Sequence, residues 1–141
     1  MTAERPWYWE GNVQRALVDH LSGWGYTILR QADTARKEHG ADIIARGEGI
    51  ILHVEVKGYP LARRKTTPNN RARQLYAQAM YAAMRLYEVR TYGVDNRVAL
   101  AFPDKDTYTR LIHKTDHALA RLGVGVFIIG RDGNVWVMRD Y

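Results

Sequence analysis

The stretch that most constrains the fold is residues 39–58, which read HGADIIARGEGIILHVEVKG. It contains two short apolar runs, Ala41–Ala45 and Ile50–Val56, rich in the β-branched side chains that pack well on a pleated surface. Between them, Gly47-Glu48-Gly49 has the chemistry of a turn, because glycine accepts a positive φ without steric cost. The two runs are therefore predicted to form a β-hairpin.

Ionisable residues occur inside this apolar stretch. Successive side chains alternate between the two faces of a strand, so His53, Glu55 and Lys57 are expected to share one face. Asp42 stands at the start of the preceding strand. Burying an unpaired charge is costly, so these groups need partners. A divalent cation is the partner that suits two carboxylates.

The rest of the chain reads as helices and strands arranged around the hairpin, in the order α-β-β-β-α-β-α-β-β. This order predicts an α/β fold in which helices pack on a mixed β-sheet. With 141 residues and no linker, a single domain over residues 1–141 is expected. Helices are predicted over Pro6–Trp24, Arg71–Arg90 and Asp104–Leu122, and further strands over Tyr26–Gln31, Arg97–Phe102, Val124–Ile129 and Val135–Met138.

The first predicted helix carries a carboxylate in an unexpected place. An apolar stripe at helical spacing runs from Val13 to Trp24 and predicts a buried face. Glu10, three residues before Val13, continues this stripe, so its carboxylate would face inward and need a partner. In the alternative interpretation the helix begins at Asn12, a residue type that caps helices, and Glu10 is solvated before it.

The charge distribution points to a polyanionic partner. The formal net charge is +6 and the sequence pI is about 9.7. No Asp or Glu occurs between Val56 and Tyr87, and a positive surface beside paired carboxylates is what a phosphodiester substrate requires. The alternative is a solvated, charged loop. The candidate DNA-binding residues are Arg63, Arg64, Lys65, Arg71 and Arg73.

Other classes of protein are disfavoured by composition. The chain has no cysteine, which excludes disulfides and thiolate metal sites. Its first residues lack the apolar core of a signal peptide, and no apolar run approaches the ~18 residues of a membrane span. A soluble, cytoplasmic protein without a membrane partner is expected.

The pattern resembles the PD-(D/E)XK, or restriction-endonuclease-like, nuclease superfamily. The order of the family core, helix, three strands, helix and strand, matches residues 6–102. Among its members the chain looks most like small Holliday-junction resolvases and related stand-alone nucleases. Ala41 stands where the motif name has Pro. The residues that carry the resemblance are Glu10 on the first helix, Ala41-Asp42 at a strand start, and Glu55-Val56-Lys57 on the next strand.

The resemblance implies a Mg²⁺- or Mn²⁺-dependent endonuclease that hydrolyses DNA phosphodiester bonds. Asp42 and Glu55 would bind the metal, and the Val56 carbonyl and Glu10 would complete an oxygen shell. Lys57 would hold or deprotonate the attacking water. The family's second helix sometimes adds a Gln near the metal. Residues with accessory roles would be Gln74, Gln78 and His53, for which a structural role is the alternative.

Two alternatives remain open. A nucleic-acid-binding module would keep the fold without cleaving its ligand. A structure-specific resolvase would act as a symmetric homodimer, in contrast to a monomeric nuclease. Binding of a divalent metal and turnover of a substrate would separate the enzyme from the binding module.

Overall fold

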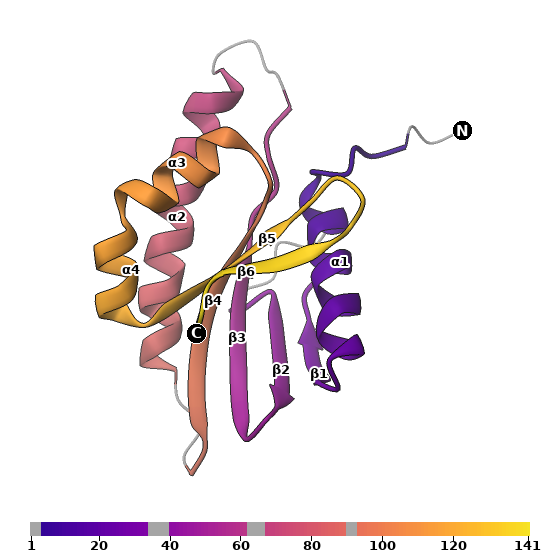
Figure 1. Ribbon diagram of the computed structural model, residues 1–141, viewed down its shortest axis with the longest axis vertical. Coiled ribbons are helices and arrows are strands. Elements are labelled where there is room, and N and C mark those ends of the chain that lie inside the picture. Colours follow the sequence, from indigo (N-terminus) through magenta and orange to yellow (C-terminus); the bar gives the residue numbers. More distant parts are fainter. Residues whose placement is uncertain (1–3, 34–39, 62–66, 90–92) are drawn as a thin grey trace.

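The computed structural model describes residues 4–33, 40–61, 67–89 and 93–141 (Figure 1). In these residues, six strands form one mixed sheet in the order β1-β2-β3-β4-β5-β6, and four helices flank it. The predicted α/β class, a mixed sheet with helices packed on it, is confirmed. The helices are α1 (Glu10–Gly23), α2 (Pro68–Glu88), α3 (Asp106–Lys114) and α4 (Asp116–Leu122). The strands are β1 (Thr27–Gln31), β2 (Ile43–Gly47), β3 (Ile50–Val56), β4 (Asp95–Pro103), β5 (Val124–Ile129) and β6 (Val135–Arg139).

The predicted hairpin is strands β2 and β3. The two strands are antiparallel, and the pairing of Gly47 with Ile50 leaves a turn of two residues. Glu48 and Gly49 in that turn both have positive φ, 54° and 78°, as a type I′ hairpin turn requires. Because Ile43 pairs with Val54, the residue before β2 lies beside the last residues of β3.

The helices form one layer on each face of the sheet. Figure 1 shows α1 on one side and α2, α3 and α4 on the other. Strand β4 is parallel to both of its neighbours, β3 and β5, and contributes apolar side chains to both layers. Ala99 and Ala101 pack with α1, whereas Leu100 and Phe102 pack with α2 and α3. The central strands are thus buried on both faces, as is usual for parallel strands.

Helix α2 is the longest helix, at 21 residues. It begins three residues earlier than its apolar pattern predicts, because the Thr67 side chain caps it by accepting from the Asn70 N–H, and Pro68 suits the first turn. Small buried residues, including Ala79 and Ala83, let the helix approach the sheet closely. In the described part of the chain, no helix is both long and apolar enough to cross a bilayer.

The buried stripe of α1 is shorter than predicted. Val13, Leu17 and Leu21 are fully buried, but Trp24 is 48% exposed. The helix ends at Gly23, and the indole of the C-cap residue Trp24 packs on the His20 ring, with centroids 4.2 Å apart, at the edge of the buried stripe.

The third predicted helix, Asp104–Leu122, is two helices. The break falls at Thr115, whose φ of −116° departs from helical values. Its hydroxyl donates to the Leu111 carbonyl at 2.8 Å and lies 2.6 Å from the Tyr76 hydroxyl of α2. A threonine side chain that bonds the preceding turn competes with the regular helix, and here it does so where α3 meets α2.

Candidate active site

Asp42 and Glu55 are brought together by the β2–β3 pairing. Asp42 immediately precedes β2, and its N–H donates to the Val54 carbonyl at 3.0 Å. The Val56 N–H donates in return to Oδ2 of Asp42 at 2.7 Å. The carboxylate of Asp42 is therefore held at the end of β3, next to the residue that follows Glu55.

Glu55 and Lys57 share a face, as strand alternation predicts. Lys57 Nζ lies 3.2 Å from Oε1 of Glu55, and the two side chains are only 14% and 13% exposed. The Lys57 N–H donates to the Ala101 carbonyl at 3.0 Å, so pairing with β4 continues past the last residue of β3. This backbone contact fixes the position from which the lysine side chain starts.

Glu10 is the first residue of α1, so the alternative in which the helix begins at Asn12 is wrong. The turn after β3 lies directly against this helix end. A Cβ placed on Gly58 would lie 2.4 Å from the Glu10 nitrogen, and the Tyr59 N–H donates to the Tyr8 carbonyl at 2.9 Å. The Gly58 backbone N–H also lowers the pKa of Glu10. Glu10 therefore faces the end of β3, which is where the inward stripe predicted it.

Burial and electrostatic interactions shift the pKa values of the three carboxyl groups. Burial raises the pKa of Glu55 to about 7, the charge of Asp42 adds to this effect, and Lys57 opposes it. Burial and the Asp42 charge raise the pKa of Glu10. Burial also raises the pKa of Asp42, against the lowering effects of the Val56 N–H, Lys57 and Arg30. We call Glu10, Asp42, Glu55 and Lys57 the acidic centre; it favours the arrival of further positive charge.

The donor chemistry of the acidic centre suits a hard divalent cation, because its oxygen ligands are carboxylates. The side chains do not form a closed shell in the positions they hold. Within the described residues, no group of three or more His, Asp or Glu side chains surrounds one point as metal ligands do. Lys57 pairs with Glu55 instead. Glu55 would therefore have to give up its ion pair with Lys57 in order to bind a metal ion. The acidic centre fits a divalent cation in its charge and in the type of its ligand atoms.

The structure does not bring the accessory candidates into the acidic centre. His53 is buried at 4% exposure, and its Nε2 lies 3.1 Å from Oδ1 of Asn96, which gives it a structural role. Gln74 and Gln78 are exposed on α2. Gln74 accepts from the Arg71 guanidinium at 3.1 Å.

The predicted DNA-binding residues divide into two groups. Arg71 and Arg73 are exposed at the start of α2. Arg63, Arg64 and Lys65 lie outside the described residues.

A cation that the sequence did not single out lies among aromatic rings from the segments before α1 and after β3. Lys105 Nζ is 4.2 Å from the ring centroid of Tyr8, 5.3 Å from that of Trp7 and 5.2 Å from that of Tyr59. Such distances allow cation–π attraction. Tyr59 follows Lys57 by two residues. No local sequence pattern predicts this cluster, because its aromatic rings come from two segments far apart in the chain and its lysine comes from a third.

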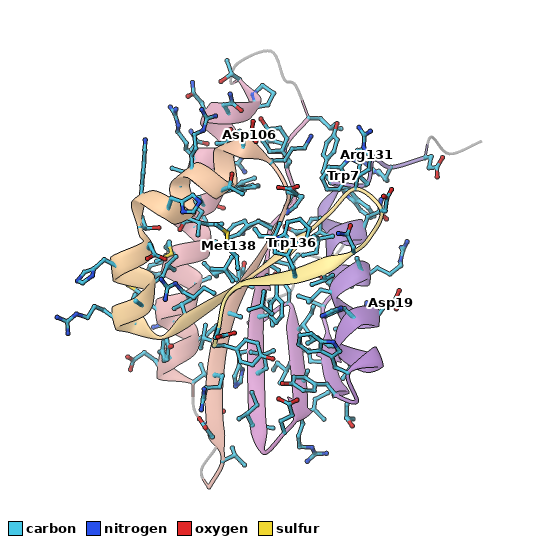
Figure 2. The ribbon with its side chains drawn as sticks, in the orientation of Figure 1. Trp7, Asp19, Asp106, Arg131, Trp136 and Met138 are labelled. Carbon is cyan, nitrogen blue, oxygen red and sulfur yellow. The ribbon has the colours of Figure 1, made fainter. Side chains whose placement is uncertain are left out.

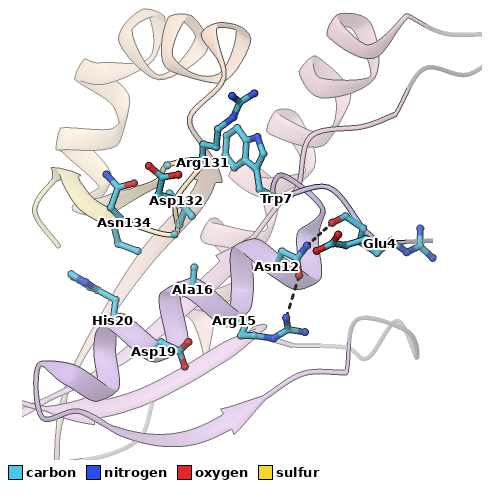
Figure 3. Close-up of a pocket in the computed structure, with 15 residues that line it drawn as sticks. Glu4, Trp7, Asn12, Arg15, Ala16, Asp19, His20, Arg131, Asp132 and Asn134 are labelled. Atoms are coloured by element: carbon cyan, nitrogen blue, oxygen red, sulfur yellow. Dashed lines mark hydrogen bonds between the residues drawn. The ribbon is translucent and has the colours of Figure 1, made fainter. Parts of the chain in front are cut away.

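An open pocket of about 670 Å³ lies elsewhere on the molecule, between α1 and the turn that joins β5 to β6 (Figure 3). Its lining carries both signs of charge, including Arg15, Asp19, Arg131 and Asp132. No residue of the acidic centre lines it. Pocket size is therefore not what marks the candidate active site, which is defined by its clustered charges.

Comparison with known proteins gives a likeness of fold. No protein-family model and no curated protein sequence matches the chain. Among solved structures, the chain is similar to a FdxN element excision controlling factor protein from Anabaena variabilis, with 16% sequence identity and a TM-score of 0.55. The match covers 88% of this chain and 95% of that chain. At this level of identity the similarity establishes the shared α/β fold alone.

Proposed function

We propose that this protein is a metal-dependent endonuclease that hydrolyses DNA phosphodiester bonds, as the PD-(D/E)XK resemblance implies. One observation carries the proposal: three carboxylates and a lysine, supplied by the start of α1, the start of β2 and the end of β3, act on one another at one place. Their burial and mutual repulsion raise the carboxyl pKa values, which is a cost to stability. Groups held together at such a cost are typical of functional sites.

Each residue of the acidic centre would have its own role in hydrolysis. A bound Mg²⁺ or Mn²⁺ would polarise the phosphoryl oxygens of the scissile phosphate. Asp42, Glu55 and the Val56 carbonyl would hold that ion, with Glu10 as a further oxygen ligand. Lys57, once released from Glu55, would orient the attacking water by a hydrogen bond from Nζ. Val56 holds Asp42 in place through its N–H.

The charge of the protein supports a nucleic acid as the substrate. The chain carries a formal charge of +6, and residues 57–86 contain no acid. Arg71 and Arg73 in this stretch are exposed at the start of α2. Cations of this kind hold the phosphate backbone of DNA without regard to its sequence.

The test combines cleavage with metal binding. Wild-type protein is incubated with supercoiled, linear, single-stranded and four-way-junction DNA, with Mg²⁺, Mn²⁺ or EDTA. Calorimetry measures the binding of Mn²⁺ alone. Asp42→Asn should abolish both cleavage and metal binding, whereas Asp19→Asn, an exposed aspartate of α1, should change neither. Wild-type protein that neither binds a divalent ion nor cuts any of these substrates would retire the proposal.

The second candidate is a nucleic-acid-binding module that has kept the fold without cleavage. The ion pair between Lys57 and Glu55, which occupies a metal ligand, favours it. This candidate predicts DNA binding in EDTA, no heat of metal binding, and a DNA affinity that does not change when Asp42 is replaced.

Light scattering of the same samples, with and without junction DNA, separates a monomer from a symmetric dimer.

A further inference from the structure

A small hollow lies between α2 and α3, which pack against each other. Its volume is about 80 Å³. Three of its five lining residues are cations and none is an acid. We call it the basic hollow; its lining is Arg73 of α2 with Thr107, Arg110, Leu111 and Lys114 of α3.

The helical repeat places these cations together. Thr107, Arg110 and Lys114 follow one another at intervals of three and four residues, so they share one face of α3. Arg73 reaches the same hollow from α2. Figure 2 shows nitrogen-tipped side chains projecting along this edge of α2 and α3.

Within the described residues, no salt bridge offsets the charges of these three cations. Arg73, Arg110 and Lys114 are exposed. Arg73 makes only a long hydrogen bond, 3.4 Å, to Oδ1 of Asn70. Three like charges that line one hollow attract an anion.

Hydrogen bonds through Asn69 connect the basic hollow with Tyr59, in the turn that follows the acidic centre's Lys57. Thr107 donates to Oδ1 of Asn69 at 2.7 Å, and the Tyr59 hydroxyl donates to the same oxygen. Tyr59 lies two residues beyond Lys57. A second open hollow, of about 370 Å³, shares Thr107 and Arg110 with the basic hollow. Its other lining residues are Tyr59, Asn69, Lys105 and two acids, Asp104 and Asp106, so the positive charge is concentrated at the basic hollow. The two hollows therefore form a surface that leads from Tyr59 to Arg110.

We infer that Arg73, Arg110 and Lys114 form a subsite for one backbone phosphate of a bound nucleic acid, away from the phosphate that is cleaved. The volume of about 80 Å³ is small beside the roughly 300–1,000 Å³ of small-molecule pockets, which favours a single compact anion. Two guanidinium groups and an ammonium supply charge-assisted hydrogen bonds to its oxygens. The inference rests on the proposed function for the identity of the ligand, and it adds Arg110 and Lys114 to the binding surface.

The test measures binding in EDTA, so it does not depend on cleavage. Fluorescence anisotropy follows a labelled DNA duplex at several KCl concentrations, for wild type, Arg110→Ala/Lys114→Ala and a control. The control, Arg121→Ala/Arg131→Ala, removes the same charge from exposed positions on α4 and on the β5–β6 turn. The first variant should flatten the log–log salt dependence by about 0.9, the loss of one phosphate contact. The control and Arg110→Lys should keep the wild-type slope.

The other outcomes overturn the inference in distinct ways. The subsite is contradicted if Arg110→Ala/Lys114→Ala keeps the wild-type salt dependence of DNA binding. It is also contradicted if the control loses as much salt dependence as this variant. A loss of about 1.8 would assign the two side chains to separate phosphates and overturn the single subsite. If wild type cuts DNA while the slopes stay equal, the inference fails and the proposed function stands. If the slope falls but no DNA is cut, the subsite stands and the nuclease fails.

Discussion

The Val56 N–H donates a 2.7 Å hydrogen bond to Oδ2 of Asp42, and this bond joins the carboxylate before β2 to the strand that carries Glu55. The bond lowers the pKa of Asp42, against the effect of burial. The two carboxylates are thus kept close by the backbone, although their charges repel. The folded chain without metal therefore carries an electrostatic cost that its pH dependence should reveal.

Glu55→Gln should make the metal-free protein more stable at pH 8. The pKa of Glu55 rises from its ordinary 4.5 to about 7 on folding, so the folded state binds more protons between these values. The stability of wild type should therefore decrease as pH rises through this range. The stability of the variant should decrease much less. The gain at pH 8 is about 3 kcal/mol.

Urea unfolding in EDTA from pH 4.5 to pH 8 measures this effect. Glu88→Gln, an exposed residue at the end of α2, is the charge-matched control and should follow wild type. Equal stability of Glu55→Gln and wild type at pH 8 would show that the raised pKa is absent.

Lys57→Ala should separate metal binding from catalysis. The lysine pairs with Glu55, and its charge lowers the pKa values of all three carboxyls. Without it, a divalent cation meets no competing charge, so calorimetry should show equal or tighter Mn²⁺ binding. Cleavage should fall by about 10²–10⁴-fold, the usual contribution of a positioned proton-transfer group. A variant with near wild-type cleavage would exclude Lys57 from the reaction.

Glu10→Gln should lower cleavage while the fold stays intact. The carboxylate faces the end of β3, where the charge of Asp42 raises its pKa, so its loss should leave the thermal midpoint unchanged or higher. Circular dichroism melting and a plasmid-nicking assay, run on the same preparation, measure both. Activity within about twofold of wild type would remove Glu10 from the site, since a lost ligand costs far more.

Gly58→Ala should damage the acidic centre through the backbone. The added Cβ would lie 2.4 Å from the Glu10 nitrogen and 2.9 Å from the Tyr8 carbonyl oxygen, so α1 or the turn must move. We expect a loss of about 1–3 kcal/mol in stability, as for other overpacked sites. Gly23→Ala is the matched control, because a Cβ there meets nothing within 4 Å. Chemical unfolding of both variants checks the difference, and equal stabilities would contradict the close contact.

The parts of the site that could be predicted from sequence are local in the chain. The β2–β3 hairpin follows from two apolar runs and a glycine turn, and the alternation along β3 puts Glu55 and Lys57 on one face. Glu10 was found because the helical spacing of α1 extends to it. These inferences need only the period of a helix or a strand.

The features that sequence did not indicate depend on contacts between distant segments. Lys105, which follows β4, contacts the rings of Tyr8 and Tyr59 only after β4 has joined the sheet and α1 has packed on it. Arg110 meets Arg73 because α3 packs on α2. The break at Thr115 likewise lies opposite Tyr76 of another helix, so no local pattern announces it.

The contact of Gly58 with the start of α1 has a consequence for the order of folding. Asp42 and Glu55 meet through a hairpin, a local structure that forms within about 1–10 μs. Glu10 reaches them only by closing a long loop, which costs more chain entropy. We expect two carboxylates to be in place early and the third to arrive late. Pulse-labelling hydrogen exchange would show this as earlier protection of the Val56 amide than of the Tyr59 amide, which donates to Tyr8.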